Sequence, residues 1–304
     1  MISQVLFMKV AVEAWRSTNV WGSIFWMFNE VWPTGGWGSI EYGSPVPGQV
    51  VGGRWKPLQY ILMNSMFADR MAGCNSGGSC FVVNSVPFLF EGTVVVRLIN
   101  MLTGTNATMV TRVSLSPGAG TTRWFCADAA SGAASLAAAP LAPLKCVAWS
   151  QTPAWKSVGC SRSGDNCAFV IKVFEGAAGD GDAGMSRAVF GGITAMSTSF
   201  VTFQPPKATR LPKAVVTASV GELVALPSPL AKSTRGGTVP ITLSTNATAL
   251  YVVLTTRADG RFSDNAFLLE AGMATVVDFL PWGPLDLQLL KTSLRVEHMA
   301  ENLV

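Results

Sequence analysis

The sequence predicts a protein of mixed class, in which an α/β segment is followed by two all-β regions. Three observations support this prediction. Apolar residues recur at helical spacing near the N-terminus, and a short apolar run follows between glycine and polar residues. From residue 73 onward, short β-type runs alternate with turn residues. We therefore divide the chain into three units, residues 1–72, 73–204 and 205–304.

The first unit combines helical and strand patterns. Four apolar residues share one helical face, namely Val5, Met8, Val12 and Trp15. No basic segment precedes them, and Lys9 and Glu13 interrupt the run, so we predict an amphipathic helix and not a signal peptide. Residues 24–28 are apolar throughout, as expected for a parallel strand buried on both faces. A second helix is predicted to start at Pro57, where the missing N–H of proline costs nothing.

The second and third units contain short, strand-like runs. In the second unit, strands are predicted at residues 81–84, 93–101, 109–114, 145–150 and 168–174. In the third unit, they are predicted at residues 214–219, 240–244, 249–255, 274–279 and 293–298. Runs spaced in this way are typical of antiparallel β-sandwiches. Residues 127–143 have low complexity, and we expect a loop insertion there.

Composition argues against two classes of partner. The net charge is +4, only 13% of the residues are charged, and lysine and arginine form no dense run. A nucleic-acid surface needs clustered basic residues, so we expect no nucleic-acid partner. The mean hydropathy is +0.36, yet no stretch reaches the roughly 18–20 apolar residues that a membrane-spanning helix requires. We therefore expect no membrane span.

The cysteines predict disulfides. All six lie in one segment, the single histidine is His298, and no C-x-x-C spacing occurs, so a zinc site has little support. We predict that sequence neighbours pair, as Cys74–Cys80, Cys126–Cys146 and Cys160–Cys167. Other pairings, or six free thiols in a cytosolic protein, are the alternatives. Two Asn-x-Thr sequons make Asn106 and Asn246 glycosylation candidates. Together these features favour a secreted, lysosomal or vacuolar protein.

Several further polar groups are predicted to be structural. Asp264 and Asn265 are expected to hold a turn through bonds to the backbone. His298 is expected to be structural and not catalytic. Residues 179–184, GDGDAG, could suggest a calcium loop, but no glutamate follows at the required spacing, so we predict a turn. We expect neither a metal nor a cofactor.

Two stretches carry a family resemblance. The run WGSIFWMFNEVWPTGGWGSIEYG at residues 21–43 is followed by GRWKPLQY at residues 53–60. Together they resemble the end of the catalytic barrel of glycoside hydrolase family 2, in its β-mannosidase-like branch. GRFSDNAFLLEAG, residues 260–272, resembles the terminal β-domain of that family, and VVNSVPFLFEGTVVVRL, residues 82–98, resembles the start of the preceding domain. The resemblance implies the C-terminal end of a (β/α)8 TIM barrel followed by two immunoglobulin-like β-sandwich domains.

The resemblance also implies a substrate-binding site. Trp26 is placed like the family tryptophan on the floor around the terminal sugar, at the C-terminal end of a barrel strand. Asn29, Glu30 and Trp32 follow at the mouth of the strand and are expected to line the same pocket. Aromatic rings would contact the apolar C–H faces of a sugar, and the polar groups would fix its hydroxyls. Relatives often have aspartate where Glu30 stands.

No catalytic residue is predicted in this chain. Retaining glycosidases use two carboxylates roughly 5–5.5 Å apart. In the family these are glutamates in phrases upstream of the first helix, and neither Glu30 nor Glu41 matches them. The resemblance thus implies a C-terminal fragment, inactive alone, of a retaining exo-glycosidase that removes terminal β-D-mannose from oligosaccharides or glycoproteins. Its partner would be the upstream barrel half of the same protein.

Two alternatives to this interpretation remain open. One is an exo-β-glucosaminidase of the same family. The other is a non-catalytic β-sandwich module that serves sugar binding or domain packing. Asn-Glu and Ser-Glu-Phe/Tyr-Gly phrases encoded upstream would favour an enzyme over the module, and GRWKPLQY favours the mannosidase branch over the glucosaminidase.

Overall fold

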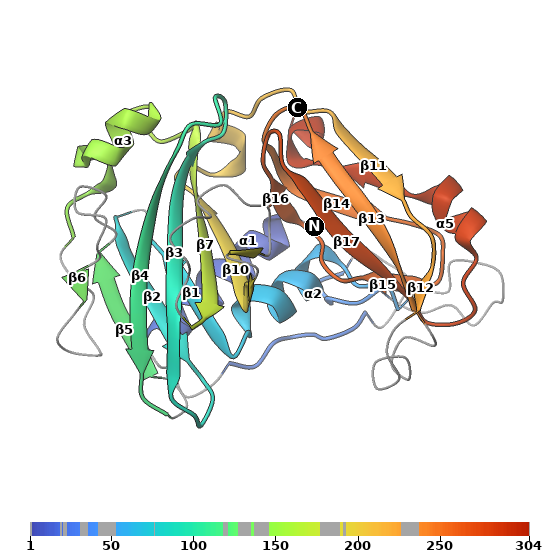
Figure 1. Ribbon diagram of the computed structural model, residues 1–304, viewed down its shortest axis with the longest axis horizontal. Coiled ribbons are helices and arrows are strands. Elements are labelled where there is room, and N and C mark those ends of the chain that lie inside the picture. Colours follow the sequence, from blue (N-terminus) through green and yellow to red (C-terminus); the bar gives the residue numbers. More distant parts are fainter. Residues whose placement is uncertain are drawn as a thin grey trace.

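The chain forms two β-sandwiches with helices between them (Figure 1). This computed structural model describes residues 2–18, 20, 23–30, 36–41, 53–75, 77–117, 121–126, 135–136, 146–176, 189–190, 193–225 and 237–303. The described part is mainly β and consists of several antiparallel sheets. The two predicted all-β regions are therefore confirmed.

The first sandwich consists of two four-stranded antiparallel sheets, with strand orders β1-β2-β5-β6 and β10-β7-β3-β4. Its strands are β1 Arg70–Cys74, β2 Ser79–Asn84, β3 Phe90–Asn100, β4 Asn106–Leu115, β5 Thr121–Cys126, β6 Ser135–Leu136, β7 Cys167–Glu175 and β10 Ser197–Thr202. A separate hairpin joins β8, Val189–Phe190, to β9, Ile193–Thr194. Strand β1 crosses the predicted boundary at residue 72, because it pairs along its whole length with β2.

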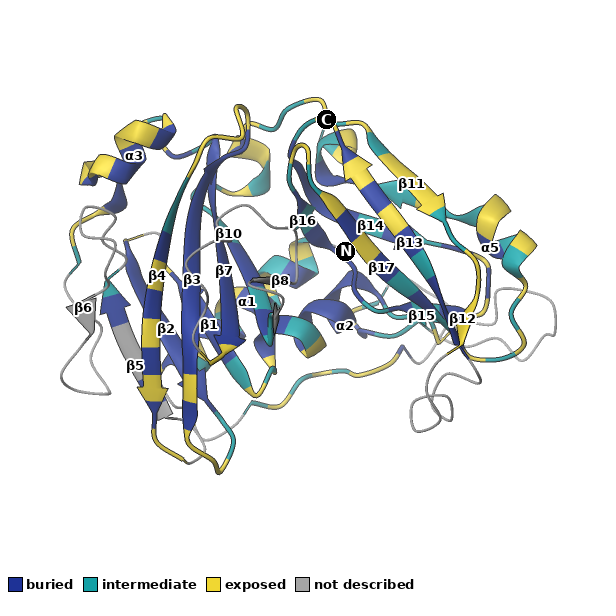
Figure 2. Ribbon diagram, in the orientation of Figure 1, coloured by how far each residue is buried: buried dark blue, intermediate teal, exposed yellow. Residues whose placement is uncertain are grey.

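The central strands of the first sandwich are buried on both faces, as the dark ribbons of β3 and β7 in Figure 2 show. Val94, Val96 and Leu98 of β3 point into the core between the two sheets. Ile99 of the same strand faces the opposite way, into a second core that includes helical residues. Because both faces are covered, these strands lack the apolar–polar alternation of a half-exposed strand.

The second sandwich consists of a five-stranded and a three-stranded sheet. The larger has the order β11-β13-β17-β15, with β12 also paired to β13, and the smaller has the order β16-β14-β18. The strands are β11 Val216–Val220, β12 Val224–Ala225, β13 Gly237–Thr245, β14 Ala249–Thr255, β15 Gly260–Phe262, β16 Phe267–Leu269, β17 Ala274–Pro281 and β18 Arg295–Glu297. In β13, Val239, Ile241 and Leu243 are buried, whereas Thr242 and Ser244 are exposed, so one face meets water.

The described helical segments are α1 Ile2–Ser17, α2 Pro57–Ile61, η1 Leu62–Met66, η2 Trp149–Gln151, α3 Pro153–Val158, η3 Pro206–Ala208, α5 Leu287–Ser293 and η4 Met299–Asn302. Two of the helices, α1 and α2, lie between the sandwiches, whereas α3 lies at the outer end of the first sandwich and α5 at the outer end of the second (Figure 1). Helix α2 begins at Pro57, as predicted, and continues into the π-helical turn η1.

A shared core joins the helices to both sandwiches. Val5 and Val12 of α1 pack with Met66, with Phe200 of β10 and with Tyr251 of β14. Polar contacts tighten this junction. The guanidinium of Arg16 donates to the carbonyls of Met66 at 2.7 Å and Ala68 at 2.8 Å. The Phe262 backbone N–H donates to the Tyr60 hydroxyl at 3.1 Å, and Arg97 of β3 pairs with Glu270 beyond β16.

One important prediction for the first unit is wrong: residues 24–28 are not a strand, and no part of a TIM barrel is evident in the described residues. Their exposure still alternates along the segment, as in an extended chain with one side packed. The physical reason is that a parallel barrel strand needs a hydrogen-bonded neighbour on each side, and the described residues provide no such pair.

Two strand predictions also need correction. Residues 145–150 were expected to be a strand, but Trp149–Gln151 forms a 3₁₀ turn that leads into α3 at Pro153. Trp149 packs its ring against Phe169 with centroids 4.3 Å apart, so the apolar character of this stretch reflects core packing and not sheet pairing. Of residues 293–298, Ser293 ends α5 and only Arg295–Glu297 pairs as β18. Most of residues 127–143 lies outside the described residues.

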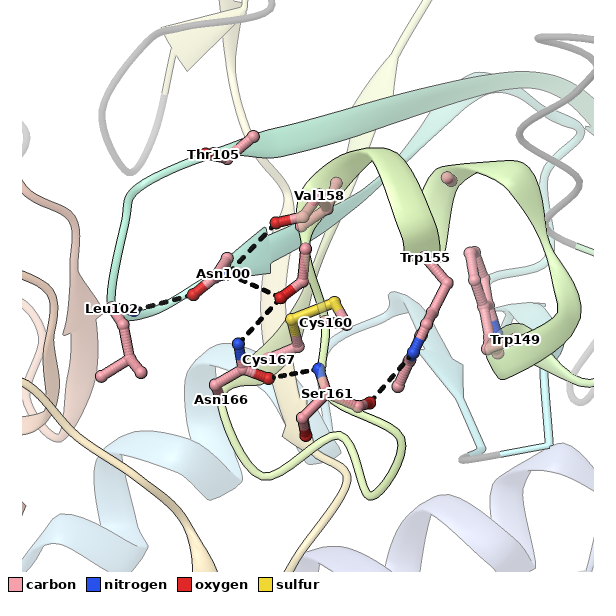
Figure 3. The surroundings of a disulfide bond; sticks show 12 residues. Asn100, Leu102, Thr105, Trp149, Trp155, Val158, Cys160, Ser161, Asn166 and Cys167 are labelled. Carbon is pink, nitrogen blue, oxygen red and sulfur yellow. Dashed lines mark hydrogen bonds between the residues drawn. A yellow bond between two sulfur atoms is a disulfide. The ribbon is translucent and has the colours of Figure 1, made fainter.

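The three disulfides pair as predicted, Cys74 with Cys80, Cys126 with Cys146 and Cys160 with Cys167. Figure 3 shows the surroundings of the third. The amide groups of Asn100 and Asn166 both donate to the carbonyl of Gly159, each at 3.0 Å. The Ser161 N–H donates to the Asn166 side-chain oxygen at 2.8 Å. This loop is therefore held by amide hydrogen bonds as well as by its disulfide.

Candidate functional site

The predicted sugar site starts from the aromatic segment 23–30. Trp26 is 77% exposed, and Ile24 and Phe28 are also exposed, whereas Phe25 packs against the shared helical core. An exposed tryptophan between exposed apolar neighbours offers an aromatic surface with nothing against it in the described residues. Such a surface fits either a sugar ring or another part of a protein.

Backbone hydrogen bonds fix the end of this segment. The N–H groups of Ser39 and Ile40 both donate to the Phe28 carbonyl at 3.0 Å, and the Glu30 N–H donates to the Ile40 carbonyl at 3.0 Å. Ile40 in turn bridges antiparallel to Trp55. The Ser39 hydroxyl, which is fully buried, lies 2.6 Å from the Gln59 side-chain oxygen. The segment is thus anchored at its C-terminal end to the residues that lead into α2.

Glu30 forms a buried ion pair with Lys56. The side chains are 2% and 6% exposed, and Lys56 also donates to the carbonyl of Gly36 at 3.0 Å. A side chain at position 36 would collide with the Glu30 carboxylate, which explains the glycine. Isolated charges cannot be buried at acceptable cost, so each member of the pair requires the other. Lys56 was not among the predicted site residues, and the available signal was a lysine directly before the predicted helix at Pro57.

Two of the four residues predicted for the sugar site are exposed to solvent. Trp26 and Asn29 are exposed, Glu30 is buried with its lysine, and Trp32 lies outside the described residues. Their roles in substrate binding remain predictions. Glu41 is also engaged, with Arg54 at 3.3 Å. Across the described ranges, no three His, Cys, Asp or Glu side chains gather in a way that could hold a metal ion, and residues 179–184 lie outside them.

Helix α1 has apolar side chains on its exposed face and a charged pair on its buried face. Phe7 is 74% exposed and Val10 is 70% exposed, and Trp15 is also exposed. On the inner side, Lys9 and Glu13 are buried and lie 2.6 Å apart, and Glu13 accepts a hydrogen bond from Ser199 at 3.0 Å. The predicted inner face is confirmed for Val5 and Val12, but Trp15 lies outward. A surface helix normally shows the reverse distribution.

The two sequon asparagines differ in their surroundings. Asn106 is exposed at the first residue of β4. Asn246 is also exposed, but its side-chain oxygen accepts the N–H of Val215 at 2.8 Å. Glycosylation at either remains a prediction.

Comparison with known proteins bears on the resemblance. Residues 226–302 match the family model Ig_mannosidase, which describes an Ig-fold domain. The C-terminal domain is a mannosidase-type Ig-fold domain. This match confirms the resemblance that was inferred from residues 260–272. Among curated protein sequences, none is significantly similar to the chain.

A solved structure extends the similarity beyond the mannosidase Ig-fold domain. The fold resembles part of the crystal structure of Beta-D-Mannosidase from Dictyoglomus thermophilum, with a TM-score of 0.60 and 18% identity. The alignment covers 98% of this chain and 29% of that chain, so the chain spans less than a third of that enzyme. At this identity the similarity concerns the fold alone. Within the described residues, no helix combines the length and the apolar character needed to cross a membrane.

Proposed function

We propose that this chain is the C-terminal part of a retaining exo-glycosidase that removes terminal β-D-mannose from oligosaccharides or glycoproteins. The upstream barrel half of the same protein supplies the catalytic glutamates and packs against the N-terminal segment of this chain. The observation that carries the proposal is that Phe7, Val10, Ile24 and Trp26, large apolar side chains close together in the N-terminal sequence, are all exposed, as expected where another part of the protein covers them. The mannosidase Ig-fold domain and the β-mannosidase fold support it.

In this proposal Trp26 forms the apolar floor under the terminal mannose and Asn29 a polar contact at its edge. The buried ion pair between Glu30 and Lys56 fixes the end of the segment 23–30 that carries Trp26 and Asn29. Trp32, which lies outside the described residues, is proposed to contact the same sugar. The three disulfides support a secreted, lysosomal or vacuolar location, because disulfides persist in oxidising compartments.

Activity assays test the reaction. The chain alone is expected to be inactive on p-nitrophenyl β-mannoside, and a chain joined to an upstream barrel that carries both catalytic phrases is expected to be active. Preference for the β-glucosaminide would favour the glucosaminidase alternative. Activity of the 304-residue chain alone would contradict the proposal that its catalytic carboxylates lie elsewhere.

Substitution of Trp26 tests its role in the completed enzyme. Trp26→Ala removes an apolar platform worth about 1.5–3 kcal/mol and should lower kcat/KM roughly tenfold or more. Trp37→Ala is the matched control, because Trp37 is also an exposed tryptophan but is not proposed to contact the sugar. Equal losses in the two variants would show that Trp26 has no special contact with the sugar.

Solubility tests the proposed barrel partner. The chain expressed alone should be poorly soluble, and Phe7→Glu with Val10→Glu should raise its solubility while preventing association with the upstream half. Val276→Glu is the control, because Val276 is exposed on β17 of the second sandwich and belongs to no proposed interface. A soluble, monodisperse wild-type chain would contradict the proposed covering of this surface.

A further inference from the structure

A cleft lies where the helices meet the two sandwiches, apart from the aromatic segment discussed above. It has a volume of about 260 Å³ and is lined by η1, by β10 of the first sandwich and by the residues around β16 of the second. None of the residues predicted for the sugar site lines it. Three segments distant in sequence therefore converge on a space that nothing in the proposed glycosidase reaction uses.

One hydroxyl in the wall of this cleft has no partner. Ser65, in η1, is 3% exposed, and its Oγ makes no hydrogen bond within the described residues. A buried hydroxyl without a partner costs about 1–3 kcal/mol. A ligand group or a water in the cleft would remove that cost, so Ser65 marks the point at which an occupant would bind.

The charges that line the cleft balance one another. Lys9 and Lys172 are matched by Asp264 and Glu270. Lys9 is held by Glu13 at 2.6 Å, Glu270 is paired with Arg97, and Asp264 accepts from Asn64 at 2.8 Å. With no surplus of either sign, the cleft favours a neutral occupant, because a net charge there would lack a counter-charge.

The apolar walls and the volume of the cleft limit the class of ligand that it can bind. Phe200, Phe267 and Met196 supply apolar surface. Drug-sized ligands occupy roughly 300–1,000 Å³, so a cleft of about 260 Å³ suits one ring and not a chain of rings. We propose that this cleft binds a neutral, polyhydroxylated ring, a monosaccharide or a cyclic polyol, with a ring hydroxyl bonded to Ser65. The ring C–H groups contact the apolar wall.

Ligand-observed NMR tests this proposal on the full chain with Phe7→Glu and Val10→Glu, the variant expected to be soluble, in which neither substituted residue lines the cleft. The probes are D-mannose, D-glucose and myo-inositol, and glycerol and maltotriose are the size controls. At least one ring probe should bind saturably in the millimolar range, and both size controls should bind more weakly. Thr198→Trp fills the cleft from β10 and should abolish that binding. Ser65→Ala removes one hydrogen bond and should weaken it roughly 5- to 10-fold.

Two controls separate the cleft from other effects. Ser79→Ala is matched to Ser65→Ala, because Ser79 is also buried with an unpartnered hydroxyl but does not line the cleft. It should leave binding unchanged, as should Trp26→Ala, which separates this site from the proposed catalytic pocket. If no ring probe binds saturably, the cleft holds water only and the proposal is wrong. Undiminished binding by Thr198→Trp or Ser65→Ala would also overturn it.

Discussion

The two sandwiches are held together in different ways. The first contains all three disulfides, at positions from Cys74 to Cys167, and the second contains none. In the first, β2, β3 and β7 are buried on both faces, whereas β13 and β17 of the second keep one face in water. The first therefore combines a doubly covered sheet with covalent links in its loops, and the second depends on a single apolar core.

In the second sandwich, side-chain hydrogen bonds hold a turn without a disulfide, whereas the Cys160–Cys167 loop of the first sandwich has both. The amide of Asn265 bonds both the N–H and the carbonyl of Leu254, each at 2.8 Å. The Asp264 carboxylate accepts the N–H of Asn265 at 2.7 Å. The prediction that these two residues hold a turn through the backbone is confirmed. Such bonds act in the folded state alone, whereas a disulfide also restricts the unfolded chain.

Reduction of the disulfides should give the largest difference between the two sandwiches. Each disulfide contributes roughly 2–4 kcal/mol, so all three together approach the whole stability of a domain. The Cys126–Cys146 link, with a separation of 20 residues, should contribute most, because it closes the longest loop. Hydrogen exchange should show protection lost in β3 and retained in β13 after reduction.

Equal loss of protection in both sandwiches would contradict this expectation, and would indicate that the shared helical core makes them one unfolding unit. Oxidised protein kept in the same buffer without reductant is the control.

Core truncation should give the next largest effect and should act on one sandwich at a time. Phe279 is fully buried and its ring centroid lies 5.5 Å from that of Phe262, so Phe279→Ala should cost roughly 3–5 kcal/mol. Phe169→Ala is the matched variant in the first sandwich. In oxidised protein, chemical denaturation should show a similar loss of unfolding free energy for both variants. Under reductant the first sandwich is expected to be unfolded already, so only Phe279→Ala should lower the denaturation midpoint of a remaining transition.

The sequence predicts the second sandwich better than the first for a physical reason. In β13, buried apolar residues such as Leu243 alternate with exposed polar residues such as Thr242 and Ser244, because one face of the strand meets water. This alternation can be recognised in the sequence. Strands β1, β5 and β10 were missed: β1 has almost no exposed position, and β5 and β10 owe their pairing to distant segments. Of the strands that are covered on both faces, β3 and β7 have long apolar runs and were predicted, whereas the five residues of β1 carry too little local pattern.

The candidate site was predicted only in part for a similar reason. The aromatic segment and its resemblance could be found from consecutive residues, including Trp26 and Asn29. The Glu30–Lys56 pair joins residues 26 positions apart, and the Ser65 cleft joins three distant segments, so no local spacing indicates either. The disulfides were predictable because the cysteines of each pair are neighbours in sequence.

Alkaline pH should weaken the second sandwich selectively. Burial raises the pKa of Tyr60, which packs in that core, from 10.0 to about 12. The folded state therefore holds the phenolic proton more tightly than the unfolded state, and stability is complete below about pH 10. It should fall by roughly 2–3 kcal/mol as the pH rises from 10 to 12. The first sandwich, residues 70–202, contains no tyrosine.

Denaturant midpoints measured across this pH range test the effect, with Tyr60→Phe as the control. That variant loses the hydroxyl that accepts the Phe262 N–H, so it should be less stable at neutral pH but should show a flatter alkaline profile. An equally steep profile in Tyr60→Phe would assign the pH dependence to other groups.

Helix capping should give the smallest difference, and it compares one helix from each sandwich. The Thr152 hydroxyl accepts the N–H of Trp155 at 3.3 Å at the start of α3, and Asp286 accepts the N–H of Leu289 at 2.8 Å at the start of α5. Thr152→Ala and Asp286→Ala should each cost about 1 kcal/mol, and Thr152→Ser should cost less than Thr152→Ala because it keeps the acceptor. Hydrogen exchange of α3 and α5 measures the local opening.

The Cys160–Cys167 link lies just beyond α3, so removing this link alone, by Cys160→Ser with Cys167→Ser, should increase the cost of Thr152→Ala and leave that of Asp286→Ala unchanged. Equal responses of the two caps to this double substitution would show that the disulfide does not restrain the helix beside it.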